Sequence, residues 1–187
     1  MTADEFRKLA LRNPVNDALL DELMRFELPD AWIVAGCLVQ TVWNVLTARP
    51  VDYGIDDYDI FYFDPEPSWQ AEDAVIRKLQ GRFATLRVKI EVRNQARVHL
   101  WYPQKYGLPY PALQSSTQGI DRFLTKNTQI GIRRARQGYD VYAPDGFDDV
   151  AGMIVRPNPG PNFSAENYKA KAKRWKMLWP EITVLPA

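Results

Sequence analysis

Three aspartates, Asp56, Asp57 and Asp59, precede a strongly β-forming apolar run in the segment GIDDYDIFYFD, residues 54–64. Side chains alternate between the two faces of a strand, so Asp57 and Asp59 should point the same way, roughly 6.5–7 Å apart along the backbone. Two carboxylates this close repel each other by about 2–3 kcal/mol if the effective dielectric is near 20. A bound cation would offset that repulsion, which makes the pair a candidate metal site.

A third acidic residue, Glu91, lies in the alternating run LRVKIEV (86–92), where it shares a predicted face with Lys89 and Arg93. The residues alone also allow simpler interpretations. Aspartate is common in turns, and the YGIDD segment is a natural loop. Glu91 fits an exposed, salt-bridged strand, in which an ion pair contributes only about 0–1 kcal/mol.

The composition limits the class of protein. The chain has 187 residues, of which 46% are hydrophobic and 25% charged, as in an ordinary globular protein. Lys and Arg total 24 against 23 Asp and Glu, a net charge of +1, so no overall field draws it to nucleic acid or an anionic membrane. The single cysteine, Cys37, excludes an intramolecular disulfide and a zinc site built from several cysteines.

The amino-terminal segment lacks the apolar core of a secretory signal, and no apolar run approaches the ~20 residues needed to span a bilayer. We therefore expect a cytoplasmic location and no membrane partner.

The pattern of apolar residues, caps and breakers predicts an α+β (mixed α/β) fold rather than a regular βαβ winding. Helices are expected at 3–11, 16–26, 38–46, 68–80, 118–126 and 164–179, with a short helix within 144–155. Strands are expected at 30–36, 58–64, 86–92, 96–102, 128–133 and 139–143. The strand at 58–64 should be central, and 86–92 and 96–102 are expected to form a hairpin that places Glu91 near His99.

We expect a single domain over residues 1–187, with a core at about 15–142 and a C-terminal helical part at about 143–187.

The motifs VAGC (34–37), DYDI (57–60) and KIEV (89–92) follow one another with a characteristic order. This arrangement resembles the nucleotidyltransferase superfamily built on a polymerase-β-type palm, which has a glycine turn, an Asp-x-Asp strand and a third carboxylate on a neighbouring strand. More narrowly, DYDIFYFD, KIEVRNQARVHLWY, VYAPDGFDDV and VRPNP resemble a bacterial branch known simply as nucleotidyltransferase family proteins. The narrower resemblance covers residues from about 30 to 180.

The resemblance implies transfer of a nucleoside monophosphate from a nucleoside triphosphate to a hydroxyl acceptor, with a mixed sheet flanked by helices and a C-terminal helical extension. Asp57 and Asp59 would hold two Mg²⁺ ions, which prefer carboxylate and phosphate oxygens. Glu91 would bind the catalytic ion and orient or deprotonate the acceptor hydroxyl. The acceptor would be a small molecule, a protein or an RNA end.

The resemblance also places the triphosphate at the helix start after Gly36, where backbone N–H groups favour anions. The family usually has Gly or Ser at the next position, whereas this chain has Cys37, whose thiol is a weaker hydrogen-bond donor than a hydroxyl. Arg133, at the end of the IGIR strand, is a further candidate phosphate ligand.

Other chemically interesting residues favour structural interpretations. His99, the only histidine, is expected to be a hydrogen-bonded residue beside Trp101 rather than a base. The basic segment NYKAKAKRWKMLW (167–179) should pack its aromatic residues on the core and leave its lysines in water, although a nucleic-acid contact is possible.

Two other functions compete with transfer. A catalytically inactive relative would keep the fold as a nucleotide-binding or protein-interaction module, which the Cys37 substitution favours. A phosphatase of the haloacid dehalogenase type also uses Asp-x-Asp and Mg²⁺, but its aspartates follow an apolar strand, whereas DYD precedes IFYF here.

Overall fold

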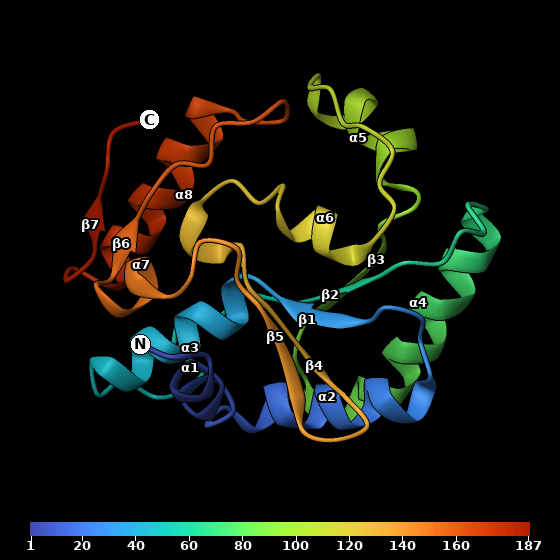
Figure 1. Cartoon of the computed structure of the whole chain (residues 1–187), viewed down its shortest axis with the longest axis horizontal. Helices are drawn as coiled ribbons and strands as arrows, with labels where there is room; N and C mark the ends of the chain where they lie inside the picture. Colours follow the sequence, from blue (N-terminus) through green and yellow to red (C-terminus); the bar gives the residue numbers. More distant parts are fainter.

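A five-stranded mixed sheet lies at the centre of the computed structural model, which describes residues 1–187 (Figure 1). Its strands are β1 (Trp32–Val34), β2 (Tyr58–Tyr62), β3 (Ile90–Asn94), β4 (Gly131–Arg134) and β5 (Tyr139–Tyr142). A separate parallel pair consists of β6 (Ile154–Val155) and β7 (Thr183–Val184).

Eight α-helices surround the sheet: α1 (Ala3–Ala10), α2 (Pro14–Phe26), α3 (Gly36–Leu46), α4 (Trp69–Phe83), α5 (Val98–Tyr106), α6 (Ser116–Ile120), α7 (Asp148–Ala151) and α8 (Ala165–Leu178). Single 3-10 turns are formed at Ala84–Leu86 and Lys126–Thr128. In the view of Figure 1, α2 and α3 lie below the sheet, and α5, α6 and α8 lie above it. This mixed arrangement confirms the predicted fold class. None of the helices combines the length and apolar character that crossing a membrane requires.

The strand order is β3-β2-β1-β4-β5. β1 is antiparallel to β2 and β4, β4 is antiparallel to β5, and only β2 and β3 are parallel. A parallel pair needs a long crossover, and α4 supplies it. β2 has a neighbour on each side, so the prediction of an interior strand is confirmed.

Several helices begin at residues whose side chains cap them, and α2 starts two residues earlier than the predicted 16–26. Thr2 and Glu5 form a complete capping box at α1, and Asn13 caps α2 ahead of Pro14. Ser68 and Ser164 accept backbone N–H bonds at the starts of α4 and α8. Local sequence therefore sets these helix boundaries.

One hydrophobic cluster of 27 buried residues extends from Phe6 to Ile182 and includes both the N-terminal helices and α8. At its centre, the Trp43 ring lies 5.3 Å from that of Trp175 and 5.7 Å from that of Trp179. The division into a core at 15–142 and a C-terminal part at 143–187 stays a prediction.

The predicted hairpin of 86–92 with 96–102 is wrong. Residues 98–106 form α5, so Glu91 and His99 are not cross-strand neighbours. The strand expected at 86–92 is observed as β3 and starts only at Ile90. Arg87 adopts a left-handed conformation (φ 53°), which breaks the extended run after Leu86. The helix expected at 118–126 is shorter and lies at Ser116–Ile120.

Candidate active site

The two strands that carry the predicted acids place two of them side by side. Asp59 is the second residue of β2, and it pairs in register with Glu91 on the parallel strand β3. Paired residues on neighbouring strands point to the same side of a sheet. The carboxylates of Asp59 and Glu91 therefore face the same side. They line a common cavity of about 380 Å³. Asp57, just before β2, lies near this pair but does not line the cavity.

Lys89 connects two of the acids, Asp57 and Glu91. Its ammonium Nζ lies 2.5 Å from a carboxylate oxygen of Glu91 and 3.4 Å from one of Asp57. Arg93 approaches the other oxygen of Glu91 at 3.3 Å. The alternative of a salt-bridged Glu91 is therefore realised, and it coexists with the clustering of the acids. A single positive charge already bridges Asp57 and Glu91.

Burial of the Asp59 carboxylate, and then repulsion from Asp57, raises its pKa to about 7. Glu91 adds to this repulsion, whereas Lys171 and Arg93 oppose it. The pKa of Glu91 is instead lowered, chiefly by its hydrogen bond from Lys89. Asp59 is thus a carboxylate that would gain from an additional nearby cation.

These residues fit a hard divalent ion by donor type, because carboxylate oxygens are the protein ligands that Mg²⁺ prefers. The Lys89 ammonium occupies the position between Asp57 and Glu91 where a cation would bind. In this arrangement no group of three or more His, Cys, Asp or Glu side chains is placed to hold a metal ion. A metal would therefore have to displace Lys89, and the three-carboxylate site stays a prediction.

The predicted glycine turn lies next to Asp59. Val34, the last residue of β1, pairs in register with Asp59, so the start of α3 at Gly36 lies beside the carboxylate pair. Ala35 has a φ of 61°, a strained value for a residue with a side chain. A Cβ at Gly36 would lie 2.8 Å from the Gln40 side-chain nitrogen, so this position requires glycine or a shift of Gln40. The backbone N–H groups of the first turn of α3 are the available anion donors.

The Cys37 side chain lies in the hydrophobic core and does not line the cavity. Its side chain is 1% exposed, belongs to the core cluster and donates a weak bond to the Val34 carbonyl at 3.5 Å. Burial, followed by the charge of Asp59, raises the pKa of its thiol. With the thiol buried in the core, the backbone N–H of Cys37 is the group left to contact a phosphate.

Arg133 is not brought to the cavity. Its guanidinium donates to Asp140 at 2.8 Å and to Asp30 at 3.1 Å, and it lies 4.4 Å from the Trp32 ring centroid. These contacts hold the guanidinium near Trp32, at the amino end of β1, whereas Asp59 pairs with Val34 at its carboxyl end. The structure offers no support for Arg133 as a phosphate ligand, and its binding role stays a prediction.

Asp56 and Asp64, the acids before and after β2, have partners outside the candidate site. Asp56 forms an ion pair with Arg174 of α8, which attaches the C-terminal helix to the DYD segment. Asp64 accepts the backbone N–H of Glu66 in a turn after β2. Both residues lie outside the strands, in loop segments on either side of β2.

Three cationic residues of the cavity were missed: Lys105 on α5, Arg122 after α6 and Lys171 on α8. None of them forms an ion pair in the structure. Lys171 was expected in water with the other lysines of its segment. It lies three residues after buried Tyr168 and four before buried Trp175, so its position on the buried face of α8 was a readable signal. Burial lowers its pKa, and Asp59 opposes that effect.

The cavity also has an aromatic wall, formed by Trp101, Tyr102 and Tyr106 of α5 and by Tyr110. The Tyr102 ring lies 4.6 Å from the rings of both Tyr106 and Tyr110. The alternation of ARVHLWY predicts a strand, in which Trp101 and Tyr102 would point to opposite faces, so these rings were not expected on one wall.

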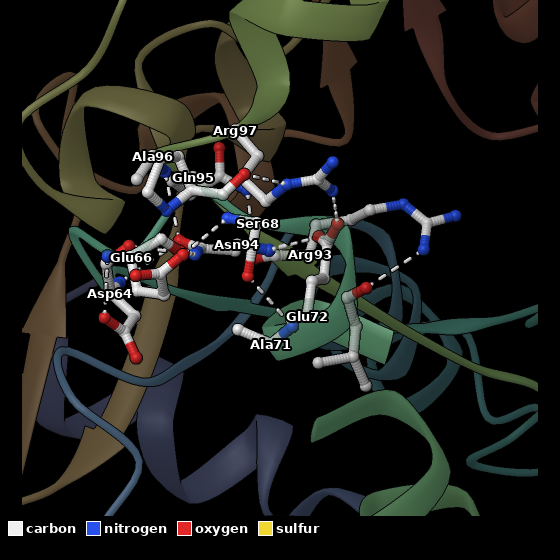
Figure 2. Close-up of polar contacts among 12 residues, drawn as sticks. Asp64, Glu66, Ser68, Ala71, Glu72, Arg93, Asn94, Gln95, Ala96 and Arg97 are labelled. Atoms are coloured by element: carbon white, nitrogen blue, oxygen red, sulfur yellow. Dashed lines mark hydrogen bonds and ion pairs between the residues drawn. The ribbon is translucent and has the colours of Figure 1, made fainter. Parts of the chain in front are cut away.

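A buried network fixes α5 above the sheet (Figure 2). Glu72, 2% exposed, accepts the Asn94 backbone N–H at 2.8 Å and forms an ion pair with Arg97, the residue just before α5. The Asn94 side chain accepts the backbone N–H groups of Asp64 and Ala96, both at 3.1 Å. These contacts join the ends of β2 and β3 to α4, and they hold the aromatic wall in place.

Comparisons with known proteins give a family match and a structural match for the chain. A family described as Nucleotidyltransferase matches residues 21–184. A structure described as revealing a CCA-adding enzyme head domain superposes with a TM-score of 0.75 at 24% identity, covering 91% of this chain and 88% of the other. At this identity the similarity shows the fold.

A curated relative, outer capsid protein VP2 of Rice ragged stunt virus (isolate Thailand), is 45% identical over 67 residues. The match covers 30% of this chain and 6% of the viral protein. The family match, in contrast, extends over most of the chain and includes the cavity strands β2 and β3 together with α3 and α8. This chain belongs to a nucleotidyltransferase family.

Proposed function

We propose that the protein is a Mg²⁺-dependent nucleotidyltransferase that moves a nucleoside monophosphate from a nucleoside triphosphate to a hydroxyl acceptor. The observation that carries this proposal is the in-register pair of Asp59 and Glu91 on one cavity wall, directly beside the start of α3. Family membership and the head-domain fold support the same reaction class.

The acceptor oxygen would bond to the α-phosphorus while the bond to the pyrophosphate oxygen breaks. Mg²⁺, when bound, supplies activation of the attacking hydroxyl and neutralisation of the leaving oxygen. Asp57, Asp59 and Glu91 would hold the metal, with Lys89 displaced. Glu91 would also orient the acceptor hydroxyl, whose proton passes to this carboxylate and then to water.

The chain supplies two further groups to the triphosphate. The first-turn N–H groups of α3 favour anions, because they lack intrahelical partners and lie at the positive end of the helix dipole. Lys171 and Arg93 face the same cavity and neutralise charge around Asp59. Both cations therefore remain near the transferred phosphate while pyrophosphate leaves.

Titration of Mg²⁺ with a nonhydrolysable ATP analogue tests the metal-nucleotide site. We expect Asp57→Asn and Asp59→Asn to weaken metal-dependent nucleotide binding by at least tenfold. Asp56→Asn is the matched control, because its side chain is 67% exposed and pairs with Arg174 outside the cavity. Equal binding by the wild type and all three variants would show that these carboxylates do not hold a metal-nucleotide complex.

A catalytically inactive, nucleotide-binding relative is the second candidate. The observation that favours it is the Lys89 bridge, which holds Asp57 and Glu91 in ion pairs that a metal must break. Incubation of the protein with each of the four labelled nucleoside triphosphates and cell extract separates the two functions. A labelled acceptor supports transfer, whereas tight nucleotide binding without any labelled product supports the inactive module.

A further inference from the structure

We propose that the aromatic wall is the acceptor subsite, and that the acceptor is a nucleotide: a planar base carrying a phosphate, either free or at the end of a single strand. This inference rests on the proposed function, because it names the acceptor for the same cavity.

The aromatic rings present accessible surface to the cavity. Tyr102 is partly exposed between Tyr106 and Tyr110, with interplanar angles of 49° and 39°. Tyr106 is 45% exposed and lines the cavity. Large aromatic side chains are normally covered in a folded protein, so a cluster open to a polar cavity fits a flat ligand. Stacking of one base on such rings contributes about 1–3 kcal/mol.

Two cations beside the rings lack acidic partners. The Lys105 ammonium lies 5.1 Å from the Tyr106 ring centroid and 5.6 Å from that of Trp101. The Arg122 Nε atom is buried and has no hydrogen-bond partner, although its residue lines the cavity. An unpartnered guanidinium nitrogen is costly unless a ligand satisfies it, and a phosphate oxygen is the acceptor it binds best. Rings and cations together match a base with its phosphate.

The position of the wall assigns it to the acceptor rather than to the triphosphate. The sheet order places β3, with Glu91, at the edge of the sheet, and α5 follows β3 directly along the chain. Trp101 and Lys105 border Arg93 of β3, and the charge of Lys105 acts on Glu91. The start of α3 lies on the other side of Asp59, beside β1. A ligand on the wall therefore approaches Glu91, the residue that would orient the acceptor hydroxyl.

The charge distribution limits the length of the acceptor that the protein contacts. The net charge is +1, so the positive charge near the wall is local. The cations that line the cavity are Arg93, Lys105, Arg122 and Lys171, so recognition there should involve only one or two phosphates. Each phosphate contact to a single strand gives a slope of about −0.7 in log K against log salt.

The experiment measures binding of two probes, AMP and a fluorescent single-stranded tetranucleotide, at saturating Mg²⁺ and nonhydrolysable ATP so that the triphosphate site is filled. Tyr102→Leu should weaken binding about tenfold for whichever of the two probes binds the wild type. Arg122→Met should reduce the salt slope by about 0.7. The matched control is Tyr53→Leu, an exposed tyrosine outside the cavity. ATP-analogue affinity should change less than twofold in all three variants.

Comparison of the probes identifies the source of the nucleotide. Tetranucleotide binding at least tenfold tighter than AMP binding indicates the end of a strand, and equal binding indicates a free nucleotide; both support the subsite. The inference is overturned if neither probe binds, or if Tyr102→Leu leaves probe binding unchanged. It is also overturned if that variant weakens ATP-analogue binding instead, since the wall would then hold the base of the triphosphate.

These outcomes are separate from failure of the proposed function. The proposed function fails if Asp57→Asn and Asp59→Asn bind the ATP analogue as tightly as the wild type does. The probes are therefore also titrated without the analogue, so that binding to the wall is measured whether or not a triphosphate binds.

Discussion

The two faces of the central sheet differ in chemistry although alternate residues of the same strands supply both. On one face, Tyr58, Ile60 and Tyr62 of β2 are buried at 3%, 0% and 1% exposure against the helices of the main core. On the other face, the intervening residues Asp59 and Phe61 line the cavity. The same alternation continues in β3, where Val92 is buried and Glu91 faces the cavity.

This difference shows how the fold tolerates charge repulsion. Ile60 pairs in register with Val92 and with Ile33, so apolar contacts anchor the strand immediately behind Asp59. The carboxylates on the opposite face are held near one another by that anchoring rather than by attraction between themselves. Stability and chemistry are therefore separated by one residue along the chain, and substitutions at neighbouring positions can distinguish them.

The largest expected effect is on the cavity face. We expect Asp59→Asn to reduce the transfer rate about 10³-fold, equivalent to about 4 kcal/mol in the activation barrier, because one metal-binding carboxylate is lost. Thermal unfolding should show a melting temperature no lower than that of the wild type, since a raised pKa means that the charged carboxylate is unfavourable in the fold. A variant that loses activity by unfolding would contradict the separation of the two faces.

The neighbouring residue should behave in the opposite way. Ile60→Ala removes a fully buried side chain and should lower the free energy of unfolding by about 2–5 kcal/mol, measured by urea denaturation. Ile60→Val, the matched conservative change, should cost about 0.5–1.5 kcal/mol. The folded fraction should keep its metal-nucleotide affinity. A specific loss of that affinity with unchanged stability would mean that the buried face also takes part in binding.

The pH dependence of stability sharpens the comparison. The pKa of Asp59 is about 7 in the fold and about 3.9 when unfolded, so between these values the folded state retains a proton that the unfolded state has lost. Its contribution to stability is fully present below about pH 4 and is lost as the pH rises to about 7. We expect metal-free wild type to lose on the order of 4 kcal/mol between pH 4 and pH 8 relative to Asp59→Asn. Parallel unfolding curves for the two proteins would contradict a buried, repelled carboxylate.

The smallest effect concerns the ion pairs of Lys89 with Asp57 and Glu91. Lys89 is 62% exposed, so Lys89→Ala should change the free energy of unfolding by less than about 1 kcal/mol. The same variant should bind Mg²⁺ and the ATP analogue several-fold more tightly, because the ammonium no longer competes for Asp57 and Glu91. Arg87→Ala, a nearby basic residue that forms no ion pair in the structure, is the control. Weaker metal-nucleotide binding by Lys89→Ala would mean that this lysine assists the ligand instead.

Part of the site could be predicted because its signals are local. The Asp57 and Asp59 spacing, the alternation around Glu91 and the glycine turn at Gly36 are all readable from short segments. The helical conformation of α5 could not be predicted in this way, because the segment ARVHLWY alternates like a strand. Contacts from Glu72, distant in sequence, hold Asn94 and Arg97 in a turn, and the chain enters a helix there.

By itself, the sequence determined the mixed α/β class, the helix starts at Thr2, Ser68 and Ser164, and the acids available for chemistry. These features depend on side-chain alternation and on hydrogen bonds between residues close in the chain. The tertiary structure alone decided that β3 pairs in parallel with β2, that Arg133 is satisfied away from the cavity, and that Lys171 and the aromatic wall face Asp59 and Glu91. Those outcomes depend on which distant surfaces exclude water together, and no short stretch of sequence contains that information.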